Sequence, residues 1–85
     1  MLNISGITLG INERFFKALD TLKQQRRLGG IGGFTKKYGM VRGNLYTIKT
    51  NKSGAVKAEY LSILVEDFGV SAEWLLTGKG EMFSK

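Results

Sequence analysis

The chain of 85 residues contains no cysteine, no histidine and no proline. Without cysteine, neither a disulfide framework nor a thiolate metal site is possible, and a reducing, cytoplasmic compartment fits. Without histidine, the commonest metal ligand and the usual general base are missing. The lack of proline is compatible with helices that are joined at glycines, of which the chain has 12. We therefore expect one small domain with no metal, no cofactor and no enzymatic activity.

Long apolar runs are also missing. No stretch approaches the roughly 18 apolar residues of a membrane span. Residues 1–10 are apolar and small, but they carry no basic residue and are interrupted by Asn3, Ser5 and Gly6, so they do not resemble a signal peptide. We expect a soluble protein with no membrane partner, in which residues 1–10 form an N-terminal arm and residues 11–85 form the domain.

Acidic residues are absent from one long central stretch. Residues 21–57 contain no Asp or Glu but nine basic residues: Lys23, Arg26, Arg27, Lys36, Lys37, Arg42, Lys49, Lys52 and Lys57. From residue 58 onward the balance inverts, with five acidic residues against two lysines. A solvated surface normally mixes the two signs, so this segregation indicates a polyanionic partner.

Helical periodicity and glycines predict five short helices and an all-α fold. The first runs to about Arg27 with Asn12 as its N-cap, and a strand is conceivable only within residues 1–10. The second covers about residues 30–38 and the third about 42–49. A polar loop at 50–54 precedes a fourth helix at about 56–68, and Ser71 caps a last one at about 72–76. Glycines 39, 69 and 78 end three of these helices.

The segment FTKKYGMVRGNLYTI, residues 34–48, has the residue types of two helices that meet through a sharp turn. Thr35 is a small residue four positions before Gly39, which takes the turn, and Met40 after it is apolar. Leu45 and Ile48 follow as the buried pair of the helix after the turn, the third of the chain. The fold class is therefore a compact five-helix bundle with a central helix-turn-helix.

This segment resembles the helix-turn-helix of the lambda-repressor-like family. The segment FGVSAEWLLTGKGEMF, residues 68–83, also looks like the end of many small phage and bacterial repressors of that family. The resemblance covers about residues 13–83. It implies that the third helix lies in the major groove of a double-stranded DNA operator and that the chain acts as a homodimer on paired half-sites.

The resemblance also implies residue roles. Base contacts are expected from Arg42, Asn44, Tyr46 and Thr47, with Arg42 suited to the O6 and N7 atoms of guanine. Gly43 has no side chain to read a base, but it permits close approach. Phosphate contacts are expected from the lysines around this helix: Lys36, Lys37, Lys49 and Lys52. Arg26 and Arg27 either join them or favour the negative end of the first helix.

Two departures from the family pattern concern contacts. Ile31 stands where many repressors have a glutamine that reaches the DNA, and Val41 stands where a Ser or Thr usually caps the reading helix. Together with the run GGIGG at residues 29–33, they suggest that the second helix is mobile or becomes ordered on DNA.

We interpret the chain as a sequence-specific transcriptional regulator, of phage or mobile-element repressor type. Trp74, Leu75, Leu76, Met82 and Phe83 are either core or dimer interface. One alternative is an antitoxin of the same fold that binds a toxin; an antirepressor is another conceivable protein partner. A second alternative is a basic module that binds RNA or protein. Neither GGIGG nor the Gly78-Lys79-Gly80 turn has the order of a phosphate-binding loop.

Overall fold

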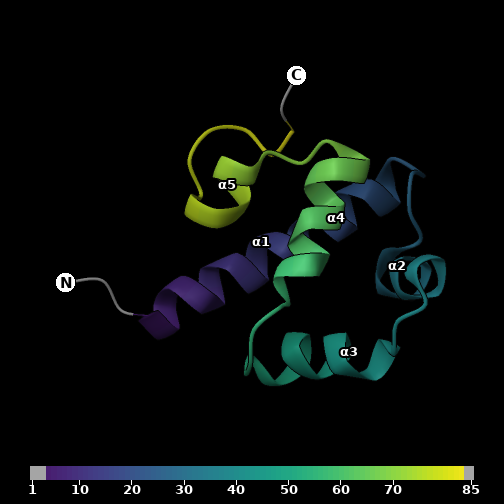
Figure 1. Cartoon of the computed structure of the whole chain (residues 1–85), viewed down its shortest axis with the longest axis horizontal. Coiled ribbons are helices and arrows are strands. Elements are labelled where there is room, and N and C mark those ends of the chain that lie inside the picture. Colours follow the sequence, from purple (N-terminus) through teal and green to yellow (C-terminus); the bar gives the residue numbers. More distant parts are fainter. Residues whose placement is uncertain (1–3, 84–85) are drawn as a thin grey trace.

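The computed structural model describes residues 4–83 (Figure 1). Within this range the secondary structure consists of helices, one isolated antiparallel bridge between Val70 and Phe83, and no strand. The predicted all-α class and the number of helices are thus confirmed. The five helices are α1 (Ile4–Gln24), α2 (Gly30–Tyr38), α3 (Arg42–Asn51), α4 (Ala58–Phe68) and α5 (Ala72–Thr77).

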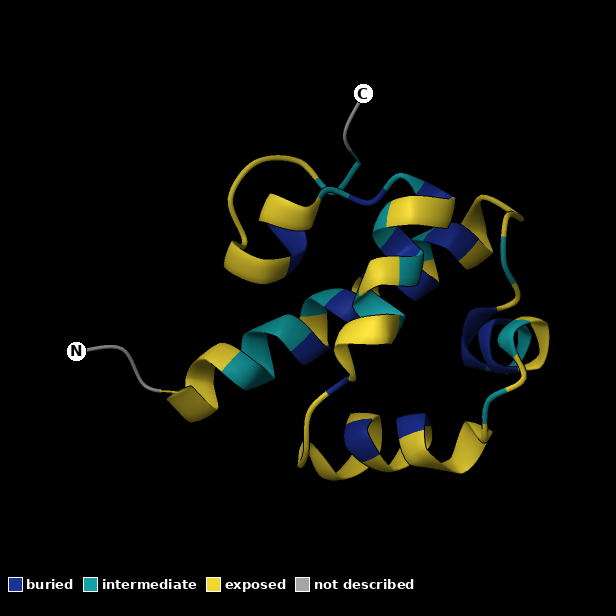
Figure 2. Cartoon of the chain, in the orientation of Figure 1, coloured by how far each residue is buried: buried dark blue, intermediate teal, exposed yellow. Residues whose placement is uncertain are grey.

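The long helix α1 is contacted by three of the other helices, α2, α3 and α5. Its fully buried Phe15 meets Phe16 and Phe34 edge-on, with ring centroids 5.2 and 5.6 Å apart. Such edge-to-face contacts stabilise a core beyond the area that they bury. Figure 2 shows the buried residues turned inward on every helix, while α3 lies along the lower edge with its outer side exposed.

The start of α1 differs from the prediction. Asn12 is not an N-cap, because the helix begins at Ile4 and Asn12 lies in its middle. Residues 4–10, expected in an N-terminal arm, are helical, and a strand there is wrong; residues 1–3 of that arm lie outside the described residues. The helix also ends earlier than expected, at Gln24, and Arg26 has a left-handed φ of 59°.

Asn12 instead ties α1 to the loop between α3 and α4. It is 4% exposed, its amide nitrogen donates to the Gly54 carbonyl at 2.9 Å, and its amide oxygen accepts from the Val56 backbone N–H at 3.0 Å. Satisfying both backbone groups removes the cost of burying them. The side chain therefore holds the loop that follows α3 against α1.

Most predicted helix ends are confirmed. Gly39, Gly69 and Gly78 all adopt the left-handed conformation that glycine accepts without strain, and Ser71 Oγ accepts the Trp74 N–H at 3.2 Å. The differences lie at other ends. Helix α3 continues to Asn51 instead of ending at about residue 49, and α4 begins at Ala58, two residues after the buried Val56.

One hydrogen bond links α2 to α4. The Tyr38 hydroxyl donates to Asp67 Oδ2 at 2.6 Å. Burial of the phenol, the hydrogen bond to Asp67 and the negative charge of that carboxylate, in this order, raise the pKa of Tyr38 from 10.0 to about 12. The C-terminal end of α2 is thereby fixed before the chain turns into α3.

Candidate nucleic-acid interface

Three residues, Gly39, Met40 and Val41, form the turn that joins α2 to α3. Gly39 has φ 70° and ψ 33°, and Met40, partly buried, packs against the core. The N–H of Met40 donates to the Thr35 carbonyl at 2.8 Å. Thr35 is 3% exposed and its hydroxyl donates to the Ile31 carbonyl at 2.9 Å, so this small polar side chain is buried with its hydrogen bond satisfied within α2. Val41 precedes α3 and forms no side-chain cap, as expected.

The predicted buried pair of α3 is confirmed, because Leu45 is 0% and Ile48 is 6% exposed. These two residues hold one side of the helix against the core. At 3.6 residues per turn, the opposite side carries Gly43, Tyr46, Thr47 and Thr50, and all four are exposed. We call these four residues the outer face of α3. These exposed residues are polar or aromatic apart from Gly43, and the exposed side of α3 lies along the lower edge of Figure 2.

Two of the predicted base-contact residues lie on this outer face. Tyr46 is 45% exposed. The Thr47 hydroxyl donates to the Gly43 carbonyl at 3.0 Å, which leaves its oxygen free to accept a hydrogen bond from outside. Thr50, which sequence reasoning placed in a loop, joins them because α3 is longer than predicted. Thr50 lies seven residues, about two helical turns, after Gly43. This spacing is the sequence signal that would have placed it on the same face of α3.

The other two predicted base-contact residues lie on the flanks. Arg42 is exposed, and its Nη1 atom lies 4.0 Å from the position that a Cβ on Gly32 would occupy, so the guanidinium extends over the first turn of α2. Asn44 is exposed two positions further along α3, about 200° around the helix from Arg42. The four residues therefore form a central pair with one polar side chain at either side.

The predicted phosphate-contact lysines do not form one group. Lys36 is exposed on α2. Lys37 reaches toward the end of α4, where its Nζ atom lies 5.7 Å from the centroid of the Phe68 ring. Lys49 and Lys52 line a cleft between α3 and α1. All four side chains are exposed, but only Lys36 lies neither beside the Phe68 ring nor along the cleft between α1 and α3.

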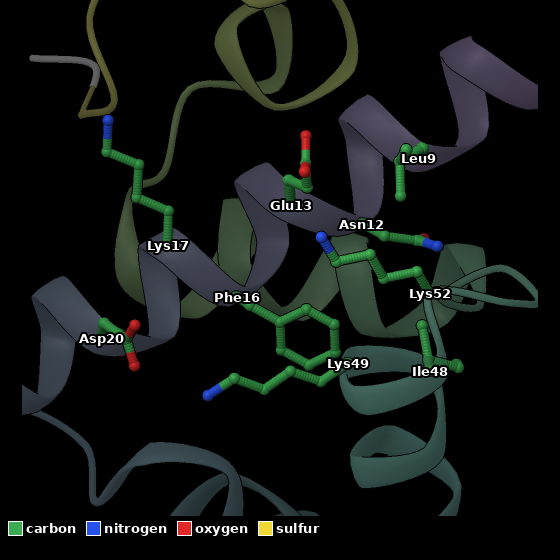
Figure 3. Close-up of a pocket in the computed structure, with 9 residues that line it drawn as sticks. All are labelled: Leu9, Asn12, Glu13, Phe16, Lys17, Asp20, Ile48, Lys49 and Lys52. Carbon is green, nitrogen blue, oxygen red and sulfur yellow. The ribbon is translucent and has the colours of Figure 1, made fainter.

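This cleft brings together charges of both signs. It has a volume of about 290 Å³ and an apolar floor that includes Phe16 and Ile48. Figure 3 shows Lys49 and Lys52 extending toward α1, the helix that carries Glu13 and Asp20 along the same cleft. The acid-free stretch of the sequence is therefore flanked, in space, by two carboxylates from outside it. Among residues 4–83, no cluster of acidic side chains is arranged to hold a metal ion.

Two arginines have structural partners that the sequence did not predict. Arg27 donates from Nη2 to the Phe68 carbonyl at 3.0 Å, and its guanidinium lies 5.5 Å from the centroid of the Phe83 ring. Arg14 donates from Nε to the Leu75 carbonyl at 2.8 Å. Both thus neutralise the negative ends of α4 and α5. No sequence signal marked these contacts, since they join residues more than 40 positions apart.

The C-terminal apolar residues are mostly core. Trp74 is 8% and Leu75 is 1% exposed, and Met82 and Phe83 pack against the core. Leu76 is the exception, with 48% of its surface exposed. It borders an apolar cleft of about 260 Å³ between α4 and α5, lined also by Ala58, Leu61, Ser62, Val65, Ala72 and Leu75.

No protein-family model matches the chain, and neither a curated protein nor a solved structure matches it. Within the described residues, no helix is both long enough and apolar enough to cross a membrane.

Proposed function

We propose that this chain is a sequence-specific double-stranded-DNA-binding regulator of the helix-turn-helix type, with α3 lying in the major groove. The observation that carries the proposal is the outer face of α3. A helix held by only two buried side chains exposes the rest of its surface, directly after a three-residue turn from a second helix. This is the shape that a major groove accepts.

Charge supports the same proposal. The outer face of α3 lies within residues 21–57, a stretch of sequence with nine basic residues and no acidic one. Arg27 is occupied by the end of α4, but the exposed Lys36 and Arg42 face solvent. Neutralising phosphates with such residues releases counterions and supplies most of the affinity for a duplex.

The roles follow from the positions of the residues. Arg42 has the two donors that pair with guanine O6 and N7, and its guanidinium lies over Gly32, which has no side chain. Thr47 offers an acceptor and Tyr46 an exposed ring, while Asn44 lies at the rim. Lys36 suits a phosphate, whereas Lys49 and Lys52 reach phosphates only by leaving the cleft that they share with Glu13 and Asp20.

We also propose that two copies bind together as a homodimer. Duplex half-sites repeat about every 34 Å, and a two-fold dimer presents two reading helices at that spacing. Helix α5, which carries Leu76 and borders the cleft with α4, lies away from α3 (Figure 1), so a second copy seated there leaves the outer face of both copies open. Such a regulator acts in the cytoplasm of a bacterium and needs neither a cofactor nor a catalytic residue.

The test is selection of bound duplexes from a random pool, followed by affinity measurements at several salt concentrations. We expect a defined sequence to emerge, present twice in the case of a dimer. The logarithm of the affinity should fall linearly with the logarithm of the salt concentration. Equal affinity for structured RNA with no preferred duplex would contradict the proposal, and would favour a basic RNA-binding module instead.

Co-purification with a small protein that masks α3 would instead favour an antitoxin or a target of an antirepressor. Duplex selection in the presence and absence of that protein separates a regulator with a partner from a chain that has no DNA specificity.

A further inference from the structure

Two residues at the start of α3 are poor choices for helix stability. Val41 is the N-cap, with φ −81° and ψ 119°, and it has no side-chain oxygen for the free N–H groups of the first turn. Gly43, two positions later, is among the least favourable residues inside a helix. Serine or threonine at the first position and alanine at the second would both favour the helix.

The packing of the protein requires neither residue. A Cβ on Gly43 would meet no atom within 4 Å, and Gly43 is not among the glycines with positive φ. Val41 is 80% exposed, so its two methyl groups contribute little to the core. Exposed apolar side chains are common on protein surfaces, but this one also occupies a position where a polar residue would serve the fold better.

Both residues are neighbours of Arg42, the residue best suited to read guanine. We infer that Val41 packs against the C5-methyl group of a thymine, in the base pair next to the guanine that Arg42 reads. Gly43 lets the base edges approach the α3 backbone. This inference rests on the proposed function and specifies part of the operator, a thymine adjacent to a guanine.

The chemistry of the major groove fits this arrangement. The thymine methyl is the one apolar group that a base pair of unmodified DNA displays there, and cytosine and guanine display none. An apolar side chain with no hydrogen-bonding atom discriminates by burying that methyl. Arg42 supplies donors and Val41 supplies apolar surface, so the two adjacent side chains read two different features of neighbouring base pairs.

The experiment uses a duplex obtained by selection, in which each thymine in turn is replaced by deoxyuridine. This replacement removes only the C5-methyl. For the wild-type chain we expect one position per half-site at which affinity falls about fourfold, the effect of one buried methyl group. In Val41→Ser, which also provides a better N-cap, the same replacement should change affinity by less than about twofold.

Two further variants sharpen the test. Ile4→Ser removes an apolar side chain that is 79% exposed on α1, and it should keep the fourfold penalty. Gly43→Ala should raise the melting temperature, because alanine favours the helix and has room there, while it lowers affinity for the selected duplex. A gain in both stability and affinity would overturn the role of Gly43.

A second arm identifies the source of the methyl group. Replacing the sensitive thymine by cytosine should weaken binding, and 5-methylcytosine at that position should restore part of it if the methyl alone is read. If no replacement has an effect that depends on residue 41, in a duplex that the chain still selects, the inference is wrong while the proposed function stands. If no duplex is selected at all, both fall.

Discussion

Arg42 and Lys36 are both exposed and both basic, yet they should affect DNA binding differently. A guanidinium that pairs with guanine discriminates between bases by about 1–3 kcal/mol, whereas an ammonium on a phosphate does not depend on sequence. Arg42→Ala should therefore reduce the preference for the selected duplex over a scrambled one by about tenfold or more.

Lys36→Ala should weaken both duplexes equally and lower the slope of affinity against salt by about one. Fluorescence anisotropy with the two duplexes at several salt concentrations measures both effects. An Arg42→Ala variant that keeps full selectivity would remove that residue from the set of base contacts.

Asn12 should contribute to stability and nothing else. Asn12→Ala leaves the Gly54 carbonyl and the Val56 N–H without their partner in a mostly buried setting, so the free energy of unfolding should fall by about 2 kcal/mol. Urea denaturation measures this change. The control is Asn44→Ala, which removes the same side chain from an exposed helical position and should change stability by less than about 0.5 kcal/mol.

The cleft between the helices α1 and α3 should restrain DNA binding. Glu13 and Asp20 line the same cleft as Lys49 and Lys52, so they lower the positive potential beside α3. Asp20→Asn should raise affinity for any duplex about twofold at low salt, with less effect at high salt because exposed charges are screened.

Glu66→Gln on α4 makes the same change in net charge at a position that does not line this cleft. It is the matched control, and binding isotherms of both variants decide the question. An equal gain from Glu66→Gln would assign the effect to net charge rather than to the cleft.

The contact between α2 and α4 should make stability depend on pH in the alkaline range. The pKa of Tyr38 is about 12 in the folded chain against 10.0 for the free group, so the unfolded chain loses this proton first. Stability from this residue is full below pH 10 and is lost as the pH rises toward 12. Denaturation midpoints should fall across this range in the wild type.

Tyr38→Phe is the control for this dependence. Because it lacks the phenol, the variant should be less stable than the wild type at pH 9 and show a smaller fall between pH 10 and 12. An identical fall in both chains would mean that other groups, such as lysines, cause it.

For the whole molecule, the proposed dimer makes Leu76 an interface residue. Leu76→Lys should shift the chain to a monomer in sedimentation equilibrium and should weaken binding to a two-half-site duplex more than to a single half-site. The melting temperature of the monomer should change little, because the side chain is already half exposed. Tyr46→Ser on the outer face of α3 should leave the oligomeric state unchanged.

The whole molecule also decides which basic residues are free. A count of basic residues in the sequence does not distinguish Arg27 from Lys36. In the structure, Arg27 is hydrogen-bonded to the end of α4 and lies by the Phe83 ring. Such distant contacts have no signature in local periodicity. The basic stretch of the sequence is therefore a larger set than the basic surface available to a polyanion.

Local sequence patterns are sufficient to predict the helix ends and buried positions that have strong signals. Glycines 39, 69 and 78 end helices because they accept a left-handed conformation, and Leu45 and Ile48 are buried because their spacing places them on one side of α3. These features depend on a few neighbouring residues, so a pattern is enough to predict them.

The start of α1, the partner of Asn12 and the surroundings of Lys49 depend on long-range contacts in the folded chain. The residues before Asn12 are weak helix signals, and Asn12 is a good cap in isolation. Its side chain instead forms hydrogen bonds with a loop 42 residues away, because a buried amide is stable only where its polar atoms have hydrogen-bond partners. Long-range hydrogen bonding and the meeting of α1 with α3 are properties of the folded chain, which no local pattern encodes.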